Sequence, residues 1–171
     1  MNTLFIIAGA IALISAAMAV SRTNAVHALL YLVVSLLAVA MVFFILGAPF
    51  AAVLEVIVYA GAIMVLFVFV IMMLNLSRSR IGERQRLKPS AWAFPVLLTL
   101  ILTVEFISVM WAGTKGVYRI MMVSPAQVGM SLMGPYLLGV ELASMLLLAG
   151  LVGAYHLAVH IGSNQNGECE R

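Results

Sequence analysis

Three glutamates stand within long apolar stretches of this sequence: Glu55, Glu105 and Glu141. A carboxylate at the centre of a membrane helix costs about 3 kcal/mol on insertion scales, so an acid in such a place is a candidate for function. Its carboxyl group could exchange a proton with its surroundings. The alternative for each glutamate is a structural role near the membrane interface, where the carboxylate reaches water or a neighbouring polar group.

Hydroxyl groups accompany two of these acids. Tyr59 follows Glu55 by four residues and Ser144 follows Glu141 by three, spacings that place each pair on one helix face. Such a pair can pass a proton or simply satisfy the carboxylate. Glu55, followed by its tyrosine, has the more favourable context for a proton path.

Residues that bind metals are sparse. His156 and His160 have the spacing of a metal-binding helix face, but no third ligand accompanies them, and His27 falls near a predicted helix end. The single Cys169 lies in a polar tail, so no thiolate cluster is available for zinc or an iron–sulfur centre. No nucleotide-binding glycine loop and no Ser-His-Asp order are found. We therefore expect neither a metal, a cofactor nor an active site in this chain.

The composition indicates that these residues lie in a membrane. Of 171 residues, 65% are hydrophobic and 9% are charged, which excludes an ordinary soluble domain. The net charge of +3 is scattered between apolar runs, which excludes a nucleic-acid-binding surface. Membrane lipid is therefore an expected neighbour.

Five apolar runs are each long enough to cross a hydrocarbon core of about 30 Å. The sequence predicts an all-α, polytopic membrane protein with one domain over residues 1–162 and a frayed polar tail over 163–171. The connection over 113–134 is too apolar for a disordered loop, so we expect it to lie against another polypeptide or in the headgroup region. Ala17-Met18-Ala19 imitates a cleavage site, but the first run is expected to be a retained helix. The predicted spans are 3–20, 25–47, 51–76, 91–112 and 135–161.

Basic residues predict the orientation. Five spans place seven lysines and arginines on the side of the C-terminus and two on the other side. By the positive-inside rule, the N-terminus is expected in the periplasm and the C-terminus in the cytoplasm. Gly47-Ala48-Pro49 is then a tight outer turn. The seven residues are Arg22, Arg78, Arg80, Arg84, Arg86, Lys88 and Arg171, and the two are Lys115 and Arg119.

The third predicted helix is longer than a membrane requires. Its 26 residues would span about 39 Å, and the excess must be taken up by tilt, kinking or rewinding. Its only glycine, Gly61, stands between Ala60 and Ala62 directly after Tyr59. A small-residue break beside polar residues predicts a π-bulge or hinge. The alternative is a site of close packing against another helix.

Three stretches resemble a known family, subunit J of the bacterial proton-pumping NADH:quinone oxidoreductase, respiratory complex I. They are residues 26–40 (VHALLYLVVSLLAVA), 55–75 (EVIVYAGAIMVLFVFVIMMLN) and 134–156 (GPYLLGVELASMLLLAGLVGAYH). The resemblance implies a five-helix, cofactor-free subunit of the bacterial inner membrane, without catalytic residues. FMN, iron–sulfur clusters and quinone would be bound by partner subunits. The implied neighbours are the small K subunit, the quinone-binding H subunit and the antiporter-like subunits.

The resemblance also implies roles for individual residues. A π-bulge around Tyr59, Gly61 and Val65 would convert to an α-helix and open a water path that couples quinone reduction to proton translocation. Glu55 and Glu141 match acids of the family, whereas Glu105 gains no support. The remaining alternatives are an accessory subunit of a multisubunit cation/proton antiporter or membrane hydrogenase, and a self-contained transporter.

Overall fold

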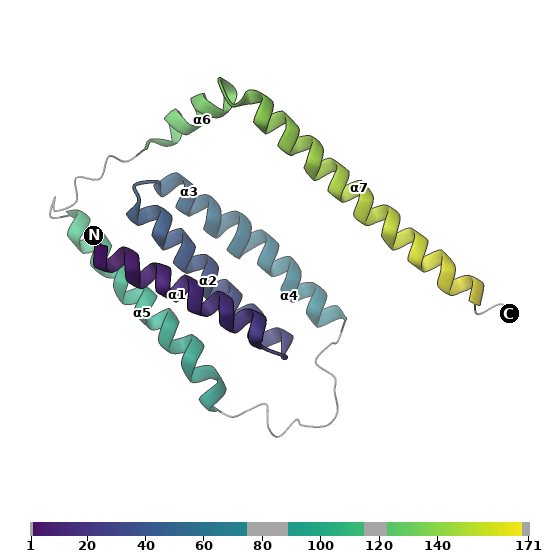
Figure 1. The fold of residues 1–171 in the computed structure, drawn as a ribbon, viewed down its shortest axis with the longest axis horizontal. Coiled ribbons are helices and arrows are strands. Elements are labelled where there is room, and N and C mark those ends of the chain that lie inside the picture. Colours follow the sequence, from purple (N-terminus) through teal and green to yellow (C-terminus); the bar gives the residue numbers. More distant parts are fainter. Residues whose placement is uncertain (1, 75–88, 115–122, 169–171) are drawn as a thin grey trace. The chain divides into compact units, whose positions relative to one another are not determined.

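The computed structural model describes residues 2–74, 89–114 and 123–168, which contain helices joined by short turns and no strand (Figure 1). Within these ranges, five helical segments are long and apolar enough to cross a membrane, which confirms the predicted fold class. The spans are Thr3–Ser21, Ala25–Ile45, Pro49–Met73, Trp92–Trp111 and Leu137–His160. The chain forms two compact units, Met1–Val123 and Ser124–Arg171, each described separately below.

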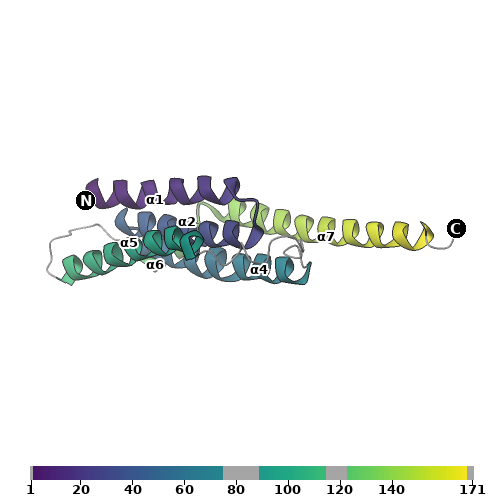
Figure 2. The same cartoon turned by 90° about the horizontal axis from the view of Figure 1, so that it is seen from below.

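Helix α2 (Ala25–Ile45) is the centre of the first unit, since α1 and every later helix of the unit pack against it. Figure 2 shows α1 (Asn2–Ser21) on one side of the layer that contains α2, α4 and α5. The Asn24 side chain accepts a hydrogen bond from the Val26 amide and so caps α2. Between the helices, the Ser35 hydroxyl donates to the Ala12 carbonyl at 2.9 Å. Helices α1 and α2 are thus joined by both apolar packing and a hydrogen bond.

The third span begins at the predicted tight turn. Gly47 has a φ of 84°, a backbone conformation that costs glycine little, and Pro49 then opens α3 (Pro49–Leu54). The helix continues as the π-helix η1 (Glu55–Ile63) and then as α4 (Met64–Met73). The amide of Val123 donates to the Gly47 carbonyl at 3.1 Å, so Val123 lies beside this turn.

Helix α5 (Pro89–Thr114) runs beside α2 in the same direction. At one end Trp92 contacts His27 edge-on, with ring centroids 6.0 Å apart, and Phe94 lies 6.2 Å from Tyr31. The hydroxyls of Thr99, Thr103 and Ser108 each donate to the carbonyl four residues earlier, which satisfies them within an apolar medium.

The second unit contains a helix that the sequence analysis placed in a loop. Within the expected connection 113–134, residues Pro125–Met133 form α6. The Ser124 hydroxyl accepts from the Gln127 amide and the Gln127 side chain accepts from the Ser124 amide. This reciprocal capping box, with Pro125 in the first turn, satisfies the helix end and explains why the segment is helical.

Helix α7 (Leu137–Glu168) extends beyond the predicted end of the last span at residue 161. The sequence after His160 contains glycines and asparagines but no proline, so no residue there forces the backbone out of the helix. Most of the tail expected to be frayed, 163–171, therefore continues α7. Cys169 and Arg171 lie outside the described residues.

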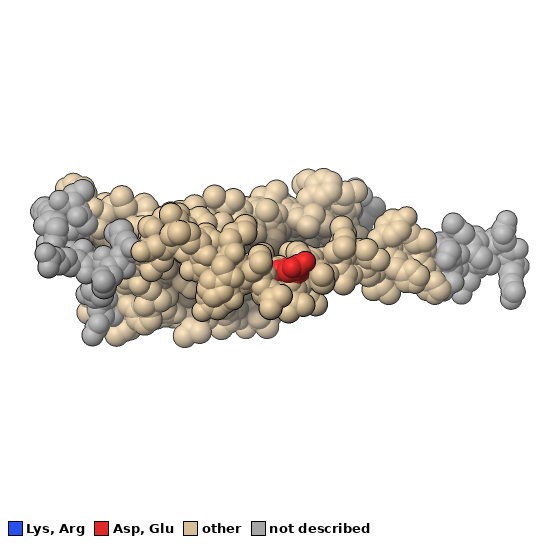
Figure 3. Space-filling model, turned by 90° about the horizontal axis from the view of Figure 1, so that it is seen from above, with Lys and Arg blue, Asp and Glu red and all other residues tan. Residues whose placement is uncertain are grey.

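Charge is nearly absent from the described surface. Arg22 is the only lysine or arginine whose side chain is described, because the basic loop and both basic residues of the outer connection fall outside the described ranges. Apart from one acidic side chain, the described atoms on the face drawn in Figure 3 carry no charge. Such a surface suits lipid or other membrane helices and not water.

Candidate functional site

The most unusual backbone of the described residues lies in the middle of the third span. Nine residues, Glu55–Ile63, form a π-helix, and the amide of Met64 donates to the Tyr59 carbonyl five residues earlier. The predicted π-bulge is therefore confirmed. Tyr59 and Gly61 lie within it, whereas Val65 lies in α4, just beyond its end. Isolated π segments inside α-helices are rare and frequently mark functional sites.

Gly61 is closely fitted to this π conformation. A Cβ atom at this position would lie 3.2 Å from the carbonyl oxygen of Val56, five residues earlier. That oxygen belongs to the backbone, so it cannot yield as the end of a flexible side chain could. A side chain at position 61 would therefore press on the π turn itself.

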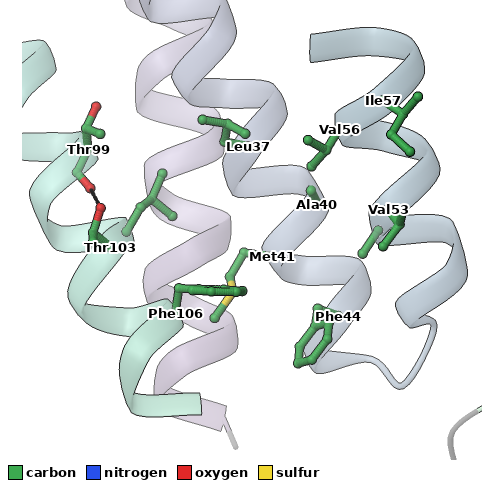
Figure 4. A pocket seen from close by; sticks show the side chains of 12 residues that line it. Leu37, Ala40, Met41, Phe44, Val53, Val56, Ile57, Thr99, Thr103 and Phe106 are labelled. Carbon is green, nitrogen blue, oxygen red and sulfur yellow. Dashed lines mark hydrogen bonds between the residues drawn. The ribbon is translucent and has the colours of Figure 1, made fainter. Parts of the chain in front are cut away.

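An apolar groove of about 460 Å³ lies between the third span, α2 and α5 (Figure 4). The third span contributes Val53, Val56 and Ile57, so the π-helix forms part of its wall. On the opposite wall, the hydroxyls of Thr99 and Thr103 are bound to backbone carbonyls of their own helix. The described lining thus offers water few free hydrogen-bonding groups in this conformation.

Glu55 and Tyr59 both lie in the π segment, and they differ in exposure. Glu55 is half-buried at the first position of the segment, while Tyr59 is exposed within its unit. Among the described residues, no hydrogen bond joins the Glu55 carboxylate to the Tyr59 hydroxyl. Their role as a proton-passing pair stays a prediction.

Glu141 lies in the second turn of α7, and the hydroxyl of its expected partner, Ser144, bonds to the backbone. The Ser144 hydroxyl donates to the backbone carbonyl of Glu141 at 2.7 Å and not to its carboxylate. In an apolar helix, a serine hydroxyl readily bonds a carbonyl one turn earlier, because this contact needs no other element. A role of Glu141 and Ser144 as a proton-passing pair stays a prediction.

Glu105 is the acid that sequence reasoning ranked lowest and that the fold buries most deeply. Its side chain is 4% exposed, and both carboxyl oxygens are buried without a hydrogen-bond partner among the described residues. It shares a face of α5 with the core residues Leu98, Leu102 and Val109. Apolar residues surround Glu105 on every face of α5, so the sequence carried no signal that its side chain faces the bundle.

The histidines form no metal site within the described residues. No group of three or more potential ligands occurs there. The rings of His156 and His160 are stacked with centroids 6.4 Å apart, as their spacing on α7 predicts. The His27 ring packs edge-on against Trp92, and its Nε2 atom is buried.

Comparisons with known proteins agree on one family. The family of NADH-ubiquinone/plastoquinone oxidoreductase chain 6 matches residues 15–157. A protein of Escherichia coli (strain K12) is 54% identical over 159 residues, which are 92% of this chain and 86% of the relative. One of Pseudomonas aeruginosa has the same identity over 92% of this chain and 96% of its own length. One of Buchnera aphidicola subsp. Acyrthosiphon pisum is 42% identical over 97% of this chain and 98% of its own length. All three bear the name NADH-quinone oxidoreductase subunit J.

Proposed function

The chain belongs to the family of NADH-quinone oxidoreductase subunit J, and we propose that it couples quinone reduction to proton translocation through a switch of its third span between π and α forms. The observation that carries this proposal is the π-helix Glu55–Ile63 in the wall of the apolar groove. As a membrane-arm subunit it acts with other subunits of the enzyme, and an antiporter accessory subunit or a lone transporter is no longer favoured.

The switch follows from helix geometry. A π turn holds one residue more than an α turn, so its loss changes the register of everything beyond it by one residue. One residue corresponds to about 100° of rotation and 1.5 Å of rise. Met64, which is 2% exposed at the start of α4, would then turn away from its present packing. The same rotation would change the side chains that line the groove and admit water.

The redox chemistry belongs to the partner subunits in this proposal. FMN, iron–sulfur clusters and quinone are held there, and this chain carries neither a cofactor nor a catalytic residue. The composition of the described residues supports this division, because they contain no cluster of metal ligands and only scattered polar side chains. The chain contributes a helix whose conformation responds to quinone reduction.

The partners proposed are the K subunit, the H subunit and the antiporter-like subunits, together with membrane lipid. Large apolar side chains on the third span support contacts with other membrane helices or lipid. Phe67 and Phe69 on α4, for example, are half exposed within their unit. Such surface is stable only when it is covered by lipid or protein.

We propose an orientation in the bacterial inner membrane with the N-terminus in the periplasm and the C-terminus in the cytoplasm. Two contacts support this orientation: Trp92 packs on His27 near the starts of α5 and α2, and the Val123 amide donates to the Gly47 carbonyl. Thr114→Cys should react with an impermeant thiol reagent from outside intact cells. Ser79→Cys, outside the described residues, should react only from the cytoplasmic side. The reverse pattern of labelling would contradict the orientation.

A cysteine at position 64 tests the proposed switch. In the resting complex, Met64→Cys should react slowly with a membrane-permeant maleimide, because its thiol is buried and the reactive thiolate needs water. During NADH-driven quinone reduction the reaction should become several times faster, as rotation brings the thiol toward hydrated space.

Ile11→Cys provides the matched control, since Ile11 is equally buried but lies in the α1–α2–α5 core away from the third span. Its labelling should stay slow in both states. Equal labelling of Met64→Cys at rest and during turnover would argue against a switch in the third span.

A further inference from the structure

The most secluded acid of the described residues lies outside the proposed switch. Glu105 is 4% exposed, and both of its carboxyl oxygens are buried without a hydrogen-bond partner among those residues. Buried polar atoms in native proteins are normally paired, so an unpaired carboxyl requires an explanation. Its neighbours on the same helix face, Leu102 and Val109, belong to the apolar core shared with α1 and α2.

Neither α1 nor α2, the described helices that pack against α5, contains an acidic or basic side chain that could pair with Glu105. Helix α1 contains no acidic, basic or histidine residue, and Glu105 is the only such residue described in α5. The titratable residues of α2 are His27 and Tyr31, which lie against Trp92 and Phe94. These contacts are 13 and 11 residues before Glu105 along α5, or about 20 and 16 Å at helical rise.

Arg22 is held at the same distant end. Its guanidinium lies over the Tyr31 ring, 5.3 Å from the centroid, and donates to the Tyr31 hydroxyl at 3.5 Å. It therefore cannot neutralise Glu105. An ionised carboxylate in such surroundings would lose its hydration without gaining a counter-charge, and buried groups in this position hold a proton instead.

We propose that Glu105 is a reversible proton-binding site, which carries a proton while its surroundings are dry and releases it when water reaches its carboxyl group. A residue needed only for packing would be better served by an aliphatic side chain, as at positions 98, 102 and 109. Leu102 and Phe106, close to Glu105 on α5, line the groove beside the π-helix. The release step therefore rests on the proposed opening of that groove, whereas the protonated resting state does not.

Infrared difference spectroscopy of the membrane-embedded complex tests the resting state. The carbonyl stretch of a protonated carboxylic acid is separate from those of carboxylates and amides. The spectrum of the wild type minus that of Glu105→Gln, recorded at neutral pH, should contain this acid band. Ser108→Ala, one turn further along α5, is the matched control and should retain the band. A difference spectrum with only carboxylate bands would overturn the proposal.

Exchange in D₂O tests reversibility. The acid band should shift to the deuterated position during NADH-driven turnover, and a band that never shifts would show an inert buried acid and overturn the proposal. Glu105→Asp keeps the acid, so it should show the band at an altered frequency even if Glu105→Gln fails to assemble. If the band shifts while Met64→Cys labelling is independent of turnover, the switch fails and the proton site stands.

Discussion

Gly61→Val should yield an assembled complex that still oxidises NADH with artificial electron acceptors but has lost most of its quinone-coupled turnover. The added Cβ meets the Val56 carbonyl oxygen at 3.2 Å in the π form, and the β-branched methyls crowd the turn further. Overpacking of this kind typically costs about 1 to 3 kcal/mol. Because about 1.4 kcal/mol changes an equilibrium tenfold, two nearly equal states would shift almost wholly to the α form.

Two further variants make the Gly61 result specific. Gly61→Ala adds the same Cβ without branching, so its loss of coupled turnover should be intermediate. Gly9→Val adds the same side chain to α1, where the new Cβ would meet no atom within 4 Å beyond the local backbone of its own helix, and it should leave coupled turnover unchanged. Normal proton pumping in a fully assembled Gly61→Val complex would remove the switch hypothesis. Failure to assemble would favour a packing role for Gly61.

Glu55→Gln and Glu141→Gln should each lower pumping-coupled quinone reduction in part, while electron transfer to artificial acceptors stays at the wild-type rate. Glutamine keeps the shape of the side chain but cannot bind and release a proton. The loss should be partial because the proposed switch is made by the backbone of the third span and not by either carboxyl group. Measurement of quinone reduction and of proton translocation in the same membrane vesicles checks this.

The conservative variants Glu55→Asp and Glu141→Asp provide the controls, since they keep an acid at each position. They should retain more coupled turnover than the amide variants. If neither glutamine substitution alters turnover or proton translocation, Glu55 and Glu141 are structural residues only.

The spans and the π-helix could be predicted from the sequence because the membrane leaves the chain few alternatives. A segment in hydrocarbon must satisfy its backbone groups internally, so a long apolar run is a helix. The excess length of the third run, with its single Gly61 between alanines, indicated where that helix would depart from α geometry. The exact limits Glu55–Ile63 depend on backbone hydrogen bonds that no composition pattern fixes.

Helix α6 could have been predicted but was not. Ser124-Pro125-Ala126-Gln127 has the spacing of a capping box with proline in the first turn, and this signature precedes the apolar part of the segment. The apolar character of the whole connection predicts a docking surface but does not by itself indicate a secondary structure.

The burial of Glu105 and the hydrogen bond of the Ser144 hydroxyl, in contrast, could not be predicted from the sequence. The rotation of α5 about its own axis, which turns Glu105 inward, is decided by packing of α5 on α1 and α2. The Ser144 hydroxyl could bond either the carboxylate or the backbone carbonyl of Glu141, since both lie within one turn. Sequence spacing allowed both outcomes, and only the three-dimensional arrangement distinguishes them.

The most direct test compares the third span in structures of the intact complex at rest and under NADH-driven turnover. At rest, the amide of Met64 should donate to the carbonyl of Tyr59, as it does here. In a turnover state it should donate to the carbonyl of Ala60, four residues earlier, with α4 rotated by about 100°. A π-helix over Glu55–Ile63 that keeps its bonding register in every state of a coupled enzyme would contradict the proposed switch.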